Sequence, residues 1–205
     1  KETLTDAGTT RTYYQFMPDG TDKVPLIVLL HGSGRDGTTL IEPWRSLASK
    51  ERVALVAPNS FVREGWSGRD GPAFFYALVE KIRAMGRIDG RRMYLFGHSA
   101  GGHHSIDMAL LESKYFAAAA VHAGGLAHDQ ALMTASASRK ITIAMWSGTD
   151  DRIVPIDFVR QSRDYLVKEG FDVKLTEILR HTHDYYGRAS EINKAGWEFL
   201  KSHQL

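Results

Sequence analysis

Residues 93–111 read MYLFGHSAGGHHSIDMALL, and they combine the features that decide the fold. A short apolar run ends in G-H-S-A-G, and a segment of helical length follows. A serine in the pattern G-x-S-x-G, between a strand and a helix, stands on a sharp, strained turn that exposes its hydroxyl above the sheet. Small flanking residues let the strand and the helix approach each other closely. The stretch therefore predicts Ser99 as a nucleophile, and a plain glycine turn is the alternative.

A second glycine-rich loop, HGSG at residues 31–34, directly follows the apolar run at residues 26–30. Acyl transfer places negative charge on a carbonyl oxygen, and preorganised backbone N–H groups stabilise that charge. We expect the N–H groups of Ser33 and Ala100 to form such an oxyanion hole. A phosphate-binding loop is the alternative, but the Gly-Lys-Ser/Thr ending that it requires is missing.

Two acids and two histidines follow later strands and compete for the remaining catalytic roles. Asp150 and Asp151 lie in the segment 146–155, WSGTDDRIVP, between a strand and a helix. An acid there can orient a histidine and stabilise its imidazolium form, whereas a helix cap is the structural alternative for either acid. His181 and His183 follow the last strand, and His183 is preferred because it lies deeper in the loop. The order Ser, Asp, His along the chain is the order expected where the serine lies in a G-x-S-x-G turn between a strand and a helix. It differs from the orders in chymotrypsin and subtilisin.

Short β-rich runs alternate with helix-length segments along the chain. Strands are expected at residues 12–17, 26–30, 53–57, 93–97, 116–121, 141–146 and 173–179. Helices are expected at residues 40–50, 73–85, 100–111, 155–168 and 190–200. This alternation predicts an α/β fold with a mostly parallel central sheet, helices on both faces, and functional loops at the carboxyl ends of the strands.

No internal repeat or flexible linker divides the chain. We expect a polar N-terminal segment at residues 1–10 and a single catalytic domain at residues 11–205. The segment 124–140 leaves room for one helix only, so no large lid domain is expected. The polar start at Lys1 suits a mature secreted protein.

Composition excludes several classes of function. The 205 residues are 43% hydrophobic and 24% charged, which is ordinary for a globular protein. A formal charge of +2 without a basic stripe argues against nucleic acid or an anionic membrane as partner. The absence of cysteine excludes disulfides, thiol catalysis and thiolate-bound metals. Apolar runs are too short to span a bilayer, and the nine histidines show no metal-binding spacing, so no metal or other cofactor is expected.

The chain resembles the α/β-hydrolase superfamily. Within it, the chain is most similar to the group of polyhydroxybutyrate depolymerases and feruloyl and acetylxylan esterases (carbohydrate esterase family 1). Besides the serine motif, the resemblance rests on PLIVLLHG at 25–32, APN at 57–59, GW at 65–66 and DGRRMY at 89–94. The family's G-T-x-D-x-x-V-P block implies that Asp151 is the catalytic acid, and its His-Asp/Glu-aromatic ending implies that His183 is the base. The stretch at 67–72 departs from the family's usual polar and acidic continuation.

The resemblance implies a serine hydrolase that cleaves carboxylic esters, on a small molecule or a polymer, through an acyl-enzyme. A serine peptidase or thioesterase on the same fold and a non-catalytic binding module are the alternatives. Trp66, Gly32 and His98 are expected to contact the substrate. Core packing is the alternative for Trp66, as is a hydrogen-bonded structural role for His98 and His122. The resemblance also favours a secreted or periplasmic location over the cytoplasm.

Overall fold

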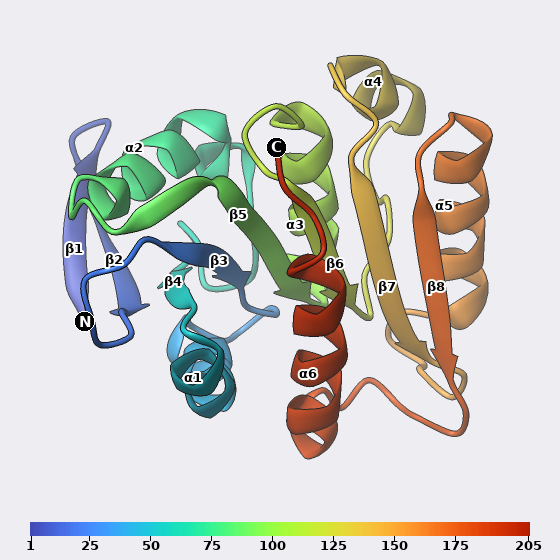
Figure 1. Ribbon diagram of the computed structural model, residues 1–205. Helices are drawn as coiled ribbons and strands as arrows, with labels where there is room; N and C mark the ends of the chain where they lie inside the picture. The colour runs from blue at the N-terminus through green and yellow to red at the C-terminus, as the bar shows by residue number, and fades with distance from the viewer.

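The computed structural model describes residues 1–205 and contains one eight-stranded sheet (Figure 1). Its strands are β1 (Glu2–Asp6), β2 (Thr9–Phe16), β3 (Val24–Leu30), β4 (Ala54–Pro58), β5 (Ile88–His98), β6 (Ala118–His122), β7 (Thr142–Gly148) and β8 (Val173–Ile178). The α-helices are α1 (Thr38–Glu51), α2 (Pro72–Arg83), α3 (Ala100–Leu111), α4 (Gln130–Ser136), α5 (Ile156–Lys168) and α6 (Ala189–Leu200). Two short 3-10 helices, η1 (Gly68–Asp70) and η2 (Tyr186–Arg188), complete the elements.

The strand order across the sheet is β1-β2-β4-β3-β5-β6-β7-β8, which Figure 1 shows from left to right. β1, β2 and β4 pair in antiparallel fashion, and every pairing from β4 through β3 to β8 is parallel. The expected mostly parallel sheet is confirmed. The parallel pairings bring the carboxyl ends of the central strands to one edge, where the loops that carry the motifs lie.

Helices cover both faces of the sheet, and each face has its own hydrophobic core. One core packs α2, α3, α4 and α5 against the sheet, and the other packs α1 and α6. β3 explains the continuous apolar run at residues 26–30. Its whole length is buried, with Leu26, Val28 and Leu30 in the first core and Ile27 and Leu29 in the second. Alternate side chains of a strand point to opposite faces, so a strand covered on both sides is apolar throughout.

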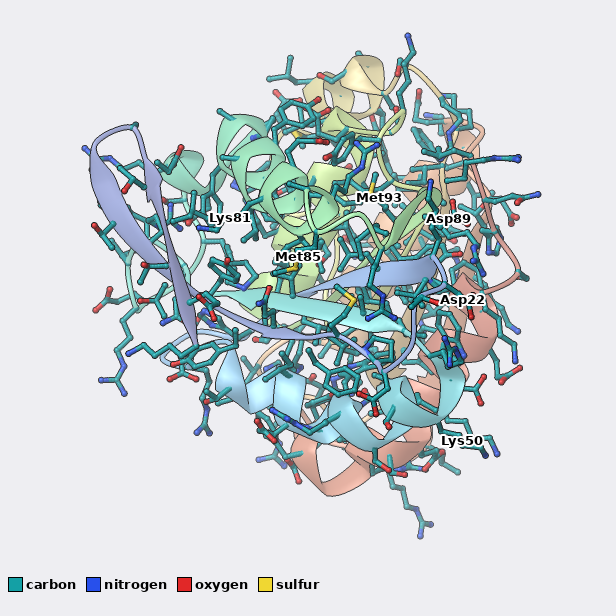
Figure 2. All side chains as sticks on the ribbon, turned by 60° about the vertical axis from the view of Figure 1, so that its left-hand side comes forward. Asp22, Lys50, Lys81, Met85, Asp89 and Met93 are labelled. Carbon is teal, nitrogen blue, oxygen red and sulfur yellow. The ribbon has the colours of Figure 1, made fainter.

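The polar residues 1–10 belong to the sheet, which the sequence did not indicate. They form β1 and the start of β2, joined by a two-residue turn in which Ala7 and Gly8 have positive φ values of 46° and 77°. Lys81 of α2 donates a hydrogen bond to the Thr3 carbonyl at 2.9 Å and holds the hairpin beside that helix (Figure 2). Within β1 only Leu4 is buried, so the strand lacks the apolar signal of the central strands.

The connection from β6 to β7 contains one helix, α4, as expected. No additional domain covers the carboxyl edge of the sheet. None of the helices has the length and apolar character needed to cross a membrane.

Candidate active site

Ser99 occupies a strained turn between β5 and α3. Its φ of 56° and ψ of −122° lie outside the regions that residues with a side chain normally adopt. The flanking glycines are required by close packing: a Cβ on Gly97 would lie 2.1 Å from the Gly101 carbonyl oxygen, and one on Gly101 would lie 1.9 Å from that of Leu30. The Ser99 N–H donates to the His122 carbonyl at 3.0 Å, which fixes the turn to β6.

A hydrogen-bonded series joins Ser99, His183 and Asp151. The Nε2 atom of His183 lies 2.9 Å from the Ser99 Oγ, and its Nδ1 lies 2.7 Å from the Asp151 Oδ2. The Asp151 side chain is fully buried, and its Oδ1 accepts hydrogen bonds from the N–H groups of Ile153 and Val154, both at 2.9 Å. Because both oxygens are engaged, the carboxylate is held with one oxygen toward the imidazole. This is the arrangement that a serine nucleophile and its general base require.

The structure separates the two acids and the two histidines that competed for these positions. Asp150 is exposed, and its carboxylate accepts from the Thr149 hydroxyl at 3.2 Å rather than contacting His183. Asp150 is not a helix cap either, because α5 has Pro155 at its N-cap and no side-chain cap. His181 is buried and makes no contact with Ser99; its Nε2 lies 3.1 Å from the Nε2 of His122.

The loops after β7 and β8, which carry Asp151 and His183, pack directly on each other. A Cβ on Gly148 would lie 2.0 Å from the His181 carbonyl oxygen, so only glycine permits this approach. The same carbonyl accepts from the Asp150 N–H at 2.9 Å. Backbone contacts therefore fix the spacing between the two loops before any side chain contributes.

The expected oxyanion donors lie against the Ser99 turn. The Ser33 N–H has no backbone acceptor within the chain. Ala100 is the first residue of α3, and the first N–H groups of a helix have no intrahelical acceptor. A Cβ on Gly32 would lie 3.3 Å from the Ser99 Cβ, and one on Gly65 would lie 3.7 Å from the Ser33 Oγ. These contacts place the Ser33 loop beside the Ser99 turn.

An open cleft of about 370 Å³ surrounds the serine hydroxyl. Its lining includes five residues that the sequence singled out: Gly32, Ser33, His98, Ser99 and His183. It also includes four that the sequence did not: Arg35, Ile153, Asp184 and Tyr186. Ile153 follows Asp151 within a few positions, as Asp184 and Tyr186 follow His183. Their closeness to these residues in the sequence could have indicated that they line the cleft. Ile153 is 70% exposed and, with Tyr186, supplies the apolar part of the rim.

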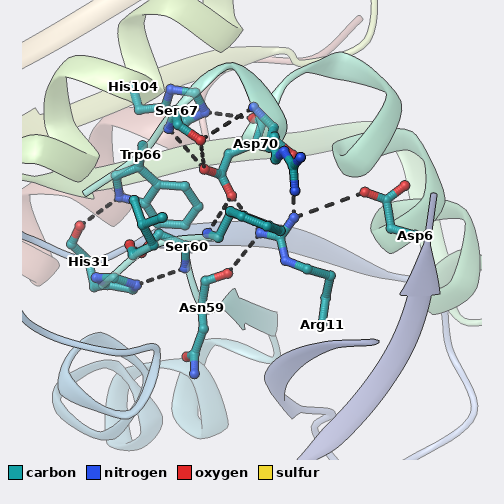
Figure 3. Close-up of polar contacts among 12 residues, drawn as sticks. Asp6, Arg11, His31, Asn59, Ser60, Trp66, Ser67, Asp70 and His104 are labelled. Carbon is teal, nitrogen blue, oxygen red and sulfur yellow. Dashed lines mark hydrogen bonds and ion pairs between the residues drawn. The ribbon is translucent and has the colours of Figure 1, made fainter. Parts of the chain in front are cut away.

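Trp66 does not line this cleft, which corrects its expected role as an aromatic wall. Its indole N–H donates to the His31 carbonyl at 2.8 Å, and its ring stacks on His104 at a centroid distance of 5.3 Å (Figure 3). The Nε2 of His31 accepts from the Ser60 N–H at 3.1 Å. Trp66 therefore stabilises the segment around His31, just before Ser33, and its role is core packing, the alternative to substrate contact.

Comparison with known proteins assigns the chain to a family. The family model described as phospholipase/carboxylesterase matches residues 72–198, a range that contains Ser99, Asp151 and His183. The chain belongs to the phospholipase/carboxylesterase family. Its α/β-hydrolase fold and its resemblance to serine esterases are thereby confirmed.

Relatives of this phospholipase/carboxylesterase family member include a probable feruloyl esterase C of Aspergillus terreus. The two are 30% identical over 159 residues, which cover 72% of this chain and 57% of the fungal protein. The chain thus spans little more than half of that relative's length. Two solved structures share the fold: esterase PE8 (TM-score 0.76, 20% identity, 94% of this chain and 98% of that one) and a ferulic acid esterase (TM-score 0.76, 17% identity, 98% and 96%).

A buried ion pair in this family member ties the N-terminal hairpin to the loop that contains Trp66. Asp70 accepts from the Arg11 guanidinium at 2.5 Å and from the N–H groups of Phe61 and Ser67, both at 2.8 Å (Figure 3). The Arg11 guanidinium also stacks 3.8 Å from the centroid of the Phe74 ring. This pair was not predicted from the sequence. The S-x-x-D spacing from Ser67 to Asp70, typical of a capping box, was the available local signal.

We expect Asp70→Asn to lower the free energy of unfolding by about 3 kcal/mol. The change leaves the Arg11 charge buried without its partner, and breaking a buried pair in this way costs about 3–5 kcal/mol. Urea denaturation followed by tryptophan fluorescence measures the loss. Asp6→Asn is the matched control: Asp6 lies 4.0 Å from the same guanidinium at a more exposed position, where about 0.5 kcal/mol is expected. Equal losses in the two variants would contradict the role of Asp70.

Three buried histidines form a hydrogen-bonded series beside His183. The Nδ1 atoms of His98 and His122 lie 3.0 Å apart, and His122 contacts His181 through Nε2. The ring of His98 lies 4.9 Å from that of His183. Burial lowers the pKa of His98 to about 3 and that of His122 to about 2, so both are neutral at ordinary pH. A neutral imidazole has one N–H, so His122 donates to one neighbour and accepts from the other.

His98 therefore has the hydrogen-bonded structural role, and it also forms part of the cleft lining. The structure contains no group of three or more histidine, aspartate or glutamate side chains arranged to hold a metal ion.

These buried histidines make the stability of the fold depend on pH. Above pH 6.5 neither the folded nor the unfolded chain protonates them, so their contribution to stability is complete. Below pH 6.5 the unfolded chain takes up protons that the folded chain excludes. The free energy of unfolding should then fall by about 1.4 kcal/mol per pH unit for each histidine, roughly 3 kcal/mol per unit for His98 and His122 together.

Urea denaturation at pH 7.5, 6.0 and 5.0 measures this slope. In His122→Gln one titrating group is removed, and the slope should decrease by about 1.4 kcal/mol per pH unit. A stability that stays constant from pH 7.5 to 5.0 would show that these histidines remain accessible to protons in the folded chain.

Proposed function

We propose that this chain is a carboxylic ester hydrolase that works through a covalent acyl-enzyme, with Ser99 as the nucleophile. The single observation that carries the proposal is the position of His183, within hydrogen-bond distance of both the Ser99 hydroxyl and the buried Asp151 carboxylate. Membership of the phospholipase/carboxylesterase family supports the same reaction class.

In the first half of the reaction the Ser99 Oγ attacks the ester carbonyl carbon while the His183 Nε2 accepts the serine proton. The Asp151 Oδ2 holds the Nδ1–H and stabilises the imidazolium that forms. The N–H groups of Ser33 and Ala100 stabilise the oxyanion. When the tetrahedral intermediate collapses, the bond to the alkoxy oxygen breaks, and the His183 Nε2 donates its proton to the departing alcohol.

In the second half a water molecule takes the place of the alcohol. His183 accepts a proton from this water as it attacks the acyl carbon, and the acid product leaves as the Ser99 hydroxyl re-forms. No cofactor takes part in either half. The open cleft and the exposed Ile153 at its rim suit an ester group carried on a larger molecule.

We further propose hydroxycinnamoyl esters, of the feruloyl type, as the substrate class. The support is the 30% identity to a probable feruloyl esterase C. A side-by-side assay of 4-nitrophenyl acetate, methyl ferulate, an acyl thioester and a peptide anilide tests both levels of the proposal. Preferred turnover of methyl ferulate supports hydroxycinnamoyl esters as the substrate class. Preference for the thioester or the anilide would replace the esterase assignment by the thioesterase or peptidase alternative, and no turnover with no fluorophosphonate labelling would favour a binding module.

A further inference from the structure

A second hollow adjoins the cleft that contains Ser99, and Arg35 lines both. This hollow has a volume of about 490 Å³. Hydroxyl, amide and guanidinium groups dominate its lining, among them those of Thr38, Asn59, Ser60 and Arg63, and Phe61 is its one hydrophobic side chain. A polar hollow that begins at the edge of the catalytic cleft can bind a polar group attached to the same substrate.

The positive charges at this hollow have no carboxylate partner within the chain. The Arg35 guanidinium faces the ring of Tyr186 at 5.3 Å from its centroid, at the rim of the cleft, and forms no ion pair. Arg63 donates through Nε to the Gly34 carbonyl at 3.3 Å and likewise forms no ion pair. Other surface arginines, such as Arg45, Arg83 and Arg160, pair with an acid close by in the sequence. Arg87 and Arg139 form no ion pair but donate to backbone carbonyl groups away from the cleft.

Two carboxylates line the same cavities as Arg35, Asp36 in the hollow and Asp184 in the cleft, and each accepts hydrogen bonds within its own turn. Asp184 accepts from the N–H groups of Tyr186 and Gly187, at 3.0 and 3.2 Å. Asp36 accepts from the Thr38 N–H at 2.9 Å and from its hydroxyl. Neither carboxylate forms an ion pair with Arg35, and the Arg35 guanidinium donates no hydrogen bond within the chain. The hollow is lined by two guanidinium groups, Arg35 and Arg63, against the single carboxylate of Asp36, so a positive charge remains there.

We infer that the hollow is a subsite for a carboxylate carried by the ester substrate, and that Arg35 determines this specificity. The inference rests on the proposed esterase function. A guanidinium binds a carboxylate through two parallel hydrogen bonds, and this geometry discriminates it from a neutral group of the same shape. Arg63, which donates to the Gly34 carbonyl beside Arg35, strengthens the attraction within the same hollow. The surrounding hydroxyl and amide groups bind the polar atoms next to the carboxylate.

The test compares matched anionic and neutral esters. One pair varies the acyl side, mono-4-nitrophenyl succinate against 4-nitrophenyl butyrate. The other varies the alcohol side, 4-acetoxybenzoate against its methyl ester. Each kcat/KM is taken after the spontaneous hydrolysis of that ester, measured in parallel, has been subtracted. This background is fast for the succinate because its carboxylate attacks its own ester carbonyl. In one of the pairs the anionic ester should be favoured by about tenfold at low ionic strength, and the preference should shrink toward parity at 0.5 M salt because the subsite is open to solvent. The pair that shows the preference identifies the side of the ester bond that the hollow serves.

Variants separate Arg35 from general effects of charge. Arg35→Gln should lower the anionic-to-neutral ratio about tenfold, and Arg35→Lys should retain part of it because the charge remains without the planar fork. Arg45→Gln removes the same charge from α1, where Arg45 pairs with Glu42, and should leave the ratio unchanged. If the wild-type chain cleaves both members of each pair equally well, the subsite inference fails and the esterase proposal stands. If it cleaves no ester, the esterase proposal fails and the inference fails with it.

Discussion

Ser99→Ala is expected to lower ester turnover by roughly 10⁶, the scale seen when a serine nucleophile is removed from a hydrogen-bonded triad. The remaining groups cannot compensate, because His183 then has no hydroxyl to deprotonate and the acyl-enzyme cannot form. Folding should be unaffected, since alanine keeps the Cβ and the same strained backbone angles are available to it. The measurement is turnover of 4-nitrophenyl acetate together with a thermal melt.

A fluorophosphonate probe gives an independent readout of the same variant. Labelling should be complete in the parent and absent in Ser99→Ala, while Ser202→Ala, which removes an exposed hydroxyl near the end of α6, should label normally. If Ser99→Ala turns over the ester within tenfold of the parent and has the same melting temperature, Ser99 is not the nucleophile.

Asp151→Asn should lower turnover by roughly 10³–10⁴, because an amide in place of the carboxylate favours the wrong imidazole tautomer. The Asp151 Oδ2 receives the Nδ1–H of His183, whereas an asparagine presenting its NH₂ group there would force the proton to Nε2. A histidine with its proton on Nε2 cannot accept one from Ser99. Asp150→Asn should cost less than about tenfold in rate, because the Asp150 side chain contacts only Thr149.

Both variants are assayed with one activated ester and checked by thermal melts. Asp150 caps no helix, so its replacement should leave the melting temperature close to that of the parent. If Asp150→Asn is the variant that loses activity, the position of the acid in this loop is wrong by one residue, and the alignment with the family's G-T-x-D block is wrong with it.

Much of the fold followed from the sequence because the central strands are buried on both faces. Such strands appear as short apolar runs, and the helix after G-x-S-x-G was predicted at residues 100–111, where α3 lies. The predicted strand ends were less accurate. β5 begins at Ile88, five residues before the predicted start, because residues 89–92 are glycine or charged and are not buried. β1 was missed for the same reason, since a polar edge strand has no continuous apolar signal.

The sequence could place the loops that carry the candidate site but not every side-chain contact within them. Ser99, His183 and Asp151 each follow a strand of one parallel sheet, so topology alone predicts that they lie near one another. The contact between Arg11 and Asp70 joins residues 59 positions apart and depends on how an edge hairpin packs. The local S-x-x-D pattern indicates the turn at Asp70 but not its partner Arg11. The position of Trp66 likewise depends on its hydrogen bond to the His31 carbonyl. An aromatic residue beside a catalytic loop can face the cleft or the interior, and only the tertiary packing decides.

The close packing of Gly148 on the His181 carbonyl has a consequence for how the molecule loses activity on heating. Asp151 and His183 sit on loops joined through backbone atoms, so they belong to one cooperative unit that opens only when β7 and β8 separate. The folded chain therefore holds the Asp151 and His183 side chains in position before any substrate binds. Thermal inactivation should accordingly coincide with the global melting transition, with no earlier stage in which the fold persists and the acid–base pair has come apart.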